Sequence, residues 1–187
     1  MHRPFHTFRQ AHLDHLDLNS DIIYPYLIDA YLARSKTVLQ RYNLKDVAPD
    51  GYKAFGPLYD YIHKSGLDRA LIDLVFLRVS QINGCAYCVD LHWRDALKAG
   101  DDPRKINSVV TWHEAPFFTP RECAALAWTE SLTNIATTGA PDADYAAVKA
   151  EFSEKEVADL TIVIALMNAM NRIGISSRLA PPLNVGA

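Results

Sequence analysis

Apolar residues recur along much of this chain at the spacing of helix faces, and turn or cap signals separate the apolar segments. Residues 67–82 form one dense apolar segment, and a second helical segment from about Cys85 to Ala99 follows Asn83-Gly84. Asn-Gly is a turn dipeptide, so these two helices should meet in a hairpin or a sharp corner. No segment shows sustained alternation of apolar and polar residues between turn signals. The pattern therefore predicts an all-α protein.

Two capping boxes predict the starts of two later helices. Thr119–Glu122 combines a threonine cap, a proline at the first helical position and a glutamate at the third. Ser153–Glu156 has the same arrangement without the proline and opens a long apolar helix, which we expect to end at Gly174. Gly100, followed by Asp101-Asp102-Pro103, should end the helix that carries Cys85.

The first part of the chain differs in character from the rest. Residues 22–39 have apolar positions suited to a helix, and Val47–Asp50 has the composition of a connector. We therefore predict an N-terminal extension, residues 1–45, that is helical and packs on the domain or on a neighbouring subunit. Residues 46–187 would then form the main domain, and the 187-residue chain is long enough to bury a core.

Composition and charge narrow the function classes. Hydrophobic residues make up 49% of the chain and charged residues 22%, which is ordinary for a globular protein. The net charge of -3, without a cluster of lysine, arginine and aromatic residues, argues against a nucleic-acid partner. The longest aliphatic run, Ile162–Met167, is too short to span a membrane, and residues 1–10 lack the apolar region of a secretory signal. With only three cysteines, the chain suits a reducing cytoplasm.

The chemistry of the chain is concentrated in residues 83–92. Cys85 and Cys88 are three positions apart, and His92 lies four beyond Cys88, so a helix would place all three side chains on one stripe. Two neighbouring thiols can alternate between a dithiol and a disulfide, and an imidazole one turn away can take a thiol proton. A helix start near Cys85 would lower the thiol pKa further. This pattern predicts thiol redox chemistry.

Other interpretations of these residues remain open at this point. Cys85 and Cys88 could be inert packed thiols, or they could bind zinc together with His92 and Asp73. The three nitrogen and sulfur donors lie within two turns of one helix, unlike the usual zinc knuckle with a distant pair, so we predict no metal or other cofactor. Asp73, inside an apolar run, would either pair with Arg69 or Arg78 or join a proton relay.

Several other polar residues are expected to have structural roles. Cys123 is predicted to be a packed bystander. His12 and His15 lie near aspartates and are predicted to form a solvated terminal face rather than a metal site. Trp112-His113 either line a pocket or cap a helix. Asn168 and Asn171, on an apolar helix, should be satisfied amides that hydrogen-bond to backbone or to a neighbouring subunit.

Residues 77–88, continuing to His92, resemble the core of the carboxymuconolactone decarboxylase family. Within that family the match is to the alkylhydroperoxidase D-like (AhpD-like) branch that keeps the paired cysteines. The similarity extends from about Tyr52 to Ser177. It includes three further motifs, Trp112–Pro116, Thr119–Glu122 and Met167–Ile173.

The resemblance implies an all-helical subunit with a helical hairpin carrying the C-x-x-C motif, assembled as a homo-oligomer that is usually trimer-based. It also implies peroxiredoxin-type activity in which Cys88 attacks the peroxide, Cys85 resolves the product and His92 belongs to a proton relay. The family's relay glutamate, twelve positions before the first cysteine, is Asp73 here. Tyr87 stands where the best-known branch has a histidine between the cysteines.

The combined expectation is a thiol peroxidase or disulfide oxidoreductase that reduces small alkyl hydroperoxides and is recharged by an external dithiol. The alternative is a non-redox protein, either a carboxymuconolactone decarboxylase-like enzyme or a metal-stapled interaction module. Because the decarboxylase branch does not need a thiol pair, Cys85 and Cys88 argue against that alternative.

Overall fold

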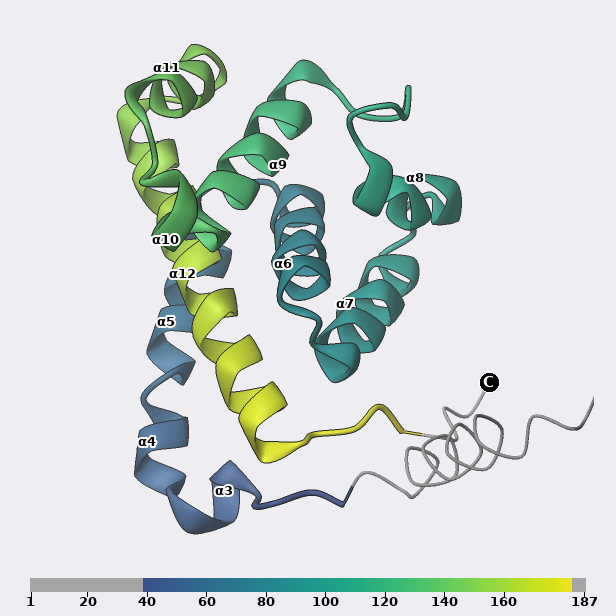
Figure 1. Ribbon diagram of the computed structural model, residues 1–187, viewed down its shortest axis with the longest axis vertical. Coiled ribbons are helices and arrows are strands. Elements are labelled where there is room, and N and C mark those ends of the chain that lie inside the picture. The colour runs from purple at the N-terminus through teal and green to yellow at the C-terminus, as the bar shows by residue number, and fades with distance from the viewer. Residues whose placement is uncertain (1–38, 183–187) are drawn as a thin grey trace, which may run out of the picture. The chain divides into compact units, whose positions relative to one another are not determined.

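The computed structural model describes residues 39–182, and within this range every regular element is a helix (Figure 1). The predicted all-α fold is therefore confirmed. The helices, in chain order, are α3 (Leu44–Val47), α4 (Pro49–Lys53), α5 (Gly56–Lys64), α6 (Arg69–Asn83), α7 (Ala86–Lys98), α8 (Pro103–Asn107), the 3-10 helix η1 (Ser108–Thr111), α9 (Pro120–Thr133), α10 (Ile135–Thr138), α11 (Asp142–Glu151) and α12 (Glu154–Ser177). The terminal histidines His12 and His15, and residues 22–38 of the predicted N-terminal helix, lie outside the described residues.

Helix α6 is the centre of the domain. It packs against α7, α9 and α12, and Figure 1 shows it between these helices. Val75 and Val79 are completely buried, and most of their neighbours along α6 are buried as well. A helix that is apolar around most of its circumference needs such surroundings, because each fully buried aliphatic side chain contributes roughly 1.5–3 kcal/mol relative to exposure. This explains why the densest apolar segment of the sequence, which forms α6, lies at the centre of the folded domain.

The corner between α6 and α7 depends on Gly84. Its φ of 71° lies in the left-handed region, which glycine enters without steric cost, and it ends α6. Cys85 follows as the N-cap of α7, so the helix itself spans Ala86–Lys98 rather than the predicted 85–99. The two helices pack against each other as the expected hairpin.

The two predicted capping boxes are present at Thr119 and Ser153, each with reciprocal hydrogen bonds to the glutamate three residues later. The expected end of α12 at Gly174 is wrong, because the helix continues to Ser177 and Arg178 adopts the left-handed cap conformation. The predicted connector at 47–50 is also wrong, since only Ala48 separates α3 from α4.

Helix α12 is the one described helix that is long and apolar enough to cross a membrane by length and composition. In this fold, 44% of its most apolar window is buried inside the protein, and it packs on α6 and α9. The core helix of a helical domain meets the same two criteria.

Residues just before α3 are tied to the end of α12. The Arg41 backbone N–H donates to the Ser177 carbonyl at 2.8 Å, and its Nη1 donates to the Ser176 carbonyl at 3.2 Å. The Tyr42 hydroxyl and Ser176 Oγ are hydrogen-bonded at 3.0 Å. Because the last carbonyls of a helix have no partners within the helix, these bonds satisfy groups that would otherwise need water. The division between an extension and a domain at residue 45 stays a prediction.

Candidate active site

Cys85 and Cys88 lie side by side at the start of α7 and are joined by a disulfide, with their Cα atoms 5.3 Å apart. The spacing argument therefore placed the two sulfurs together correctly. Cys85 Sγ also accepts a hydrogen bond from the Cys88 backbone N–H at 3.4 Å. The free N–H groups at this helix end favour a negative charge, so a thiolate formed here on reduction is stabilised.

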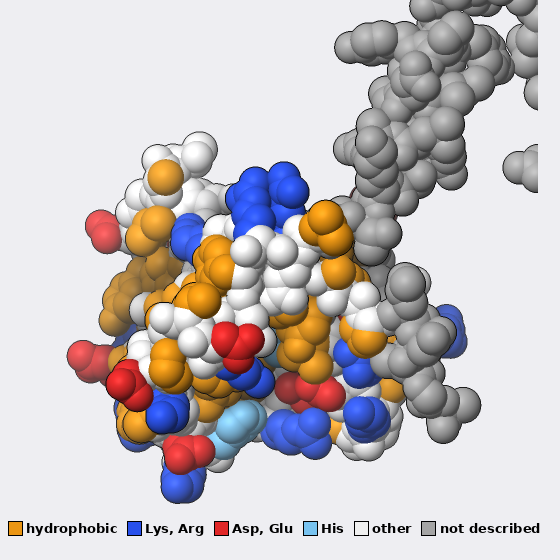
Figure 2. Space-filling model, turned by 90° about the horizontal axis from the view of Figure 1, so that it is seen from below, with side chains coloured by type: hydrophobic (Ala, Val, Ile, Leu, Met, Phe, Trp, Pro, Cys, Tyr) orange, Lys and Arg blue, Asp and Glu red, His pale blue; other side chains and the backbone are white. Residues whose placement is uncertain are grey.

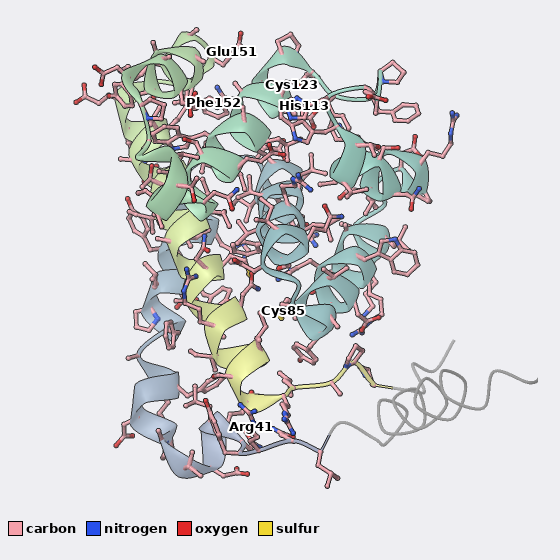
Figure 3. The ribbon with its side chains drawn as sticks, viewed as in Figure 1. Arg41, Cys85, His113, Cys123, Glu151 and Phe152 are labelled. Carbon is pink, nitrogen blue, oxygen red and sulfur yellow. A yellow bond between two sulfur atoms is a disulfide. The ribbon has the colours of Figure 1, made fainter. Side chains whose placement is uncertain are left out.

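The disulfide is covered by α12 at Gly174. A Cβ atom on Gly174 would lie 3.3 Å from Cys85 Sγ and 3.6 Å from Cys88 Sγ. Figure 3 shows Cys85 at the corner of α6 and α7, on the side facing α12. The absence of a side chain at Gly174 is therefore what lets α12 pack against the sulfurs, and this accounts for a glycine inside the helix.

A pocket of about 480 Å³ reaches Cys88 and His92 but not Cys85. Its walls come from the segment between residue 40 and the start of α5, from α7 and from the last turns of α12. Figure 2 views the lower end of Figure 1, where hydrophobic side chains lie among lysine and arginine side chains. The apolar part of the lining includes Tyr52, Phe55, Tyr59, Leu91, Met167 and Met170.

His92 lines this pocket one turn beyond Cys88, on the same helix. Its side chain is buried, and its ring packs against Phe76 with a centroid distance of 5.1 Å. Burial lowers the pKa of His92 to about 4, against a smaller opposing effect of Asp95. At neutral pH the imidazole is therefore uncharged and has a ring nitrogen that can accept a proton.

Asp73 lies apart from the pocket. Its carboxylate is buried, and Oδ2 lies 3.4 Å from Arg69 Nε, so Arg69 rather than Arg78 is its partner. Burial raises the pKa of Asp73, opposed by Arg69. Within residues 39–182 no hydrogen bond joins Asp73 to His92. The side chain that touches His92 from α6 is instead Phe76, one turn after Asp73.

An amide network holds the corner of α6 and α7 against α12. Asn83 Nδ2 donates to Asn171 Oδ1 at 2.9 Å and to Asn168 Oδ1 at 3.1 Å. Asn171 Nδ2 donates in turn to Ser80 Oγ at 3.1 Å. Both α12 asparagines are hydrogen-bonded, Asn168 in part to backbone at Ile164 as predicted, but most of their partners are side chains of the same subunit. The bonds fix the position of the residues that precede Cys85.

Trp112 and His113 belong to a separate polar cluster around Glu130. Trp112 Nε1 donates to Glu130 Oε1 at 2.7 Å, and Arg78 Nη2 lies 2.7 Å from the same oxygen. Burial opposes ionisation of Glu130, but these hydrogen bonds bring its pKa below its usual range. Neither Trp112 nor His113 lines the pocket, and Trp112 is the C-cap of η1.

Two further sequence interpretations concern thiols and metals. Cys123 is a free, half-buried thiol packed against the second core cluster, and burial raises its pKa. In the part of the chain that the structure describes, no three His, Cys, Asp or Glu side chains are grouped as a metal site requires. Cys85 and Cys88 are therefore the one pair of neighbouring cysteines in that range.

Sequence reasoning missed most of the pocket wall. Tyr52, Phe55 and Tyr59 follow one another at intervals of three and four residues, as do Met167, Met170 and Gly174. The second set lies on one face of α12, whereas Tyr52 lies on α4, Phe55 caps α5 and Tyr59 lies on α5. In neither case does the spacing say whether the side chains meet a core or a pocket. Only the packing of α12 beside α7 settles that question.

Comparison with known proteins identifies the family of the chain. Residues 49–131 match the carboxymuconolactone decarboxylase family. The chain is 36% identical over 137 residues to the uncharacterized protein YdfG of Bacillus subtilis, which covers 73% of this chain and 93% of YdfG.

Solved structures share the fold. A protein of unknown function from Agrobacterium tumefaciens, proposed to be the antioxidant defence protein AhpD, is 38% identical with a TM-score of 0.76, covering 78% of this chain and 100% of that one. The debrominase Bmp8 is 20% identical with a TM-score of 0.63, covering 72% of this chain and 73% of that one. This chain belongs to the carboxymuconolactone decarboxylase family and has its AhpD-like all-α fold.

Proposed function

We propose that this protein is a thiol-dependent peroxidase that reduces small organic hydroperoxides through Cys85 and Cys88. The observation that carries the proposal is the pocket, which reaches Cys88 and the uncharged His92 but not Cys85. A substrate in the pocket therefore meets one sulfur of the pair. This asymmetry supports Cys88 as the attacking thiol and Cys85 as the resolving one.

The first half of the reaction oxidises Cys88. His92 takes the Cys88 thiol proton, and the start of α7 stabilises the thiolate. The thiolate attacks the terminal oxygen of the hydroperoxide, the O–O bond breaks, and the alcohol leaves with the proton returned by His92. Cys88 is left as a sulfenic acid, two electrons more oxidised than the thiol.

The second half restores the dithiol. The Cys85 thiol attacks the Cys88 sulfur, a disulfide forms and the sulfenic oxygen leaves as water. An external dithiol then exchanges with the disulfide, gives up two electrons and two protons, and becomes a disulfide itself. Asp73, which has no direct bond to His92 within residues 39–182, acts on it in this scheme through a bridging water.

The proposal also includes a cytoplasmic, trimer-based homo-oligomer. A dithiol cycle requires a reducing compartment. Large apolar side chains remain exposed on several elements of the single subunit, among them Trp93 on α7, Val110 on η1 and Ile175 on α12. Subunit contacts would remove such surface from water.

The test counts thiols and products in the reduced protein. Addition of cumene hydroperoxide should remove two thiols per molecule and yield one cumyl alcohol. Cys88→Ser should consume no peroxide, and Cys85→Ser should complete one turnover and leave a sulfenic acid that dimedone traps. Cys123→Ser is the matched control and should behave as the parent.

The proposal fails if the parent protein keeps both thiols after cumene hydroperoxide is added. A sulfenic acid on Cys85 in the Cys88→Ser variant would reverse the two assignments. Because Bmp8 with the same fold is a debrominase, 2,3,4-tribromopyrrole belongs in a parallel sample. If that sample releases bromide and the hydroperoxide sample consumes no peroxide, the substrate that oxidises the thiols is an organobromide rather than a hydroperoxide.

A further inference from the structure

One wall of the pocket comes from a segment that precedes the part of the chain matching the family. Gln40, Asn43, Leu44 and Lys45 line the pocket, whereas the family match begins at residue 49. The residues that do the proposed chemistry, by contrast, lie within the match. The segment 40–45 therefore adds a wall to the thiol site from outside the residues that match the family model.

The wall is held in place by α12, the helix that also covers the sulfurs. Arg41 bonds to the carbonyls of Ser176 and Ser177, and Tyr42 bonds to the Ser176 hydroxyl. Ser177 itself lines the pocket, one turn beyond Gly174. These bonds give the wall a fixed position relative to Cys88, so a ligand would meet a preformed surface.

The charged residues that line the pocket are of one sign. They are Lys45 and Lys53, and the lining contains neither aspartate nor glutamate. Lys45 makes no ion pair within residues 39–182, and its Nζ lies 5.0 Å from the centre of the Tyr52 ring. Lys53 lies 3.4 Å from Asp50 with both side chains exposed, a weak pairing.

The remaining lining is apolar and aromatic. Tyr52, Phe55 and Tyr59 face the methionines of α12 across a space of about 480 Å³, which is the size of a small-molecule site. A rigid apolar group fills such a space well, and Met side chains adapt to its shape. Because Lys45 and Lys53 are exposed, their charges lie where the pocket meets solvent.

We infer that the preferred substrate is an organic hydroperoxide with an apolar body and a carboxylate at the end remote from the peroxide. This inference rests on the proposed peroxidase function and specifies its substrate class. The carboxylate pairs with Lys45, the body lies against Tyr52 and Met170, and the peroxide reaches Cys88. The carboxylate takes no part in the redox step, which yields the corresponding alcohol and water as before.

The experiment compares cumene hydroperoxide with its para-carboxylate, which have the same apolar body. The rate constant for thiol loss in the reduced parent should be about fivefold higher for the carboxylate at low salt, the effect of one exposed ion pair. The ratio of the two rate constants should fall towards one in high salt. It should also fall towards one in the Lys45→Met variant and in the Lys45→Met, Lys53→Met double variant. Lys98→Met, an exposed lysine of α7 away from the pocket, is the matched control and should keep the parent ratio.

A binding measurement separates this inference from the peroxidase proposal. Calorimetry on the disulfide form with para-isopropylbenzoate, an unreactive carboxylate, should show binding that Lys45→Met weakens and Lys98→Met does not. Equal rates for the two hydroperoxides, with two thiols lost in each case, would overturn the inference and leave the peroxidase function intact. A preference that survives in the Lys45→Met, Lys53→Met double variant would also overturn it. If neither hydroperoxide removes thiols, the peroxidase function itself fails.

Discussion

Gly174 on α12 faces Cys85 so closely that a Cβ atom there would lie 3.3 Å from its sulfur. The sulfur belongs to a disulfide and cannot swing aside as the end of a flexible side chain can. Gly174 and Cys85 thus form a close contact between α12, the longest helix within residues 39–182, and the disulfide. The contact links the packing of α12 to the state of the thiols.

Replacement of Gly174 by alanine should lower the stability of the disulfide form. Alanine gains roughly 0.5–1 kcal/mol of helix propensity, but overpacking of a buried site costs about 1–3 kcal/mol, so we expect a net loss of about 1 kcal/mol. Urea unfolding followed by circular dichroism measures the difference. Gly51→Ala on α4 is the control, since its Cβ would meet only Ala48 at 4.0 Å. A Gly174→Ala protein more stable than the parent would show that a methyl group fits between α12 and the disulfide.

The stability of the protein should depend on the protonation of His92. Its pKa is about 4 in the folded protein and near 6.5 when unfolded, so the unfolded chain binds more protons between these values. The contribution of His92 is therefore fully present above pH 6.5 and is lost as the pH falls towards 4, by about 3 kcal/mol in all.

Urea unfolding of the disulfide form at pH 7 and at pH 4.5 tests this dependence. His92→Gln, which cannot take up a proton, should show a smaller loss of stability between the two pH values than the parent. Subtracting the two proteins removes the contribution of Asp73, whose raised pKa acts in the opposite direction. Identical pH profiles would mean that the imidazole is not held in its neutral form by burial.

Asp73→Asn should slow the oxidation of Cys88, by less than the ~10²-fold typical of a group that transfers the proton directly. The reason is the absence, within residues 39–182, of a direct bond between Asp73 and His92. Asp73→Glu should accelerate oxidation, because the longer side chain restores the reach of the family's glutamate. Stopped-flow measurement with cumene hydroperoxide gives both rates. If both variants match the parent, Asp73 serves only the ion pair with Arg69.

The particle mass should exceed that of one 20.9 kDa subunit and correspond to a multiple of three subunits. The exposed apolar side chains, Trp93 and Val110 among them, supply surface that association would bury. Multi-angle light scattering on a size-exclusion column measures the mass. A single 20.9 kDa species at micromolar concentration would contradict the predicted assembly.

Local signals in the sequence predicted local structure well. Thr119 and Ser153 start helices because their hydroxyls and the following glutamates bond to the same turn of backbone, and no distant residue is involved. Likewise, the three-residue spacing of Cys85 and Cys88 was enough to predict that the two sulfurs lie next to each other. Such interactions can be predicted because both partners lie within one turn of the same element.

Predictions that needed a distant partner did less well. Gly174 has the composition signal of a helix end, but the sulfurs that require the glycine lie on α7. Asp73 is an exception, because its partner Arg69 lies only four residues earlier on α6, and the sequence named Arg69 without separating it from Arg78. Lys45 gave no signal at all, because its place on the pocket depends on where the chain meets α12.

The hydrogen bond from Arg41 to Ser176 joins positions 135 residues apart, so both ends of the described chain meet beside the pocket. The segment that lines the pocket before α4 and the helix pair that holds the thiols are therefore distinct parts of the chain. Cys85, Cys88 and His92 lie outside this segment, on α7 and its N-cap. Under the proposed function, substitutions in this short segment would alter the substrate range and leave the thiol pair as it is.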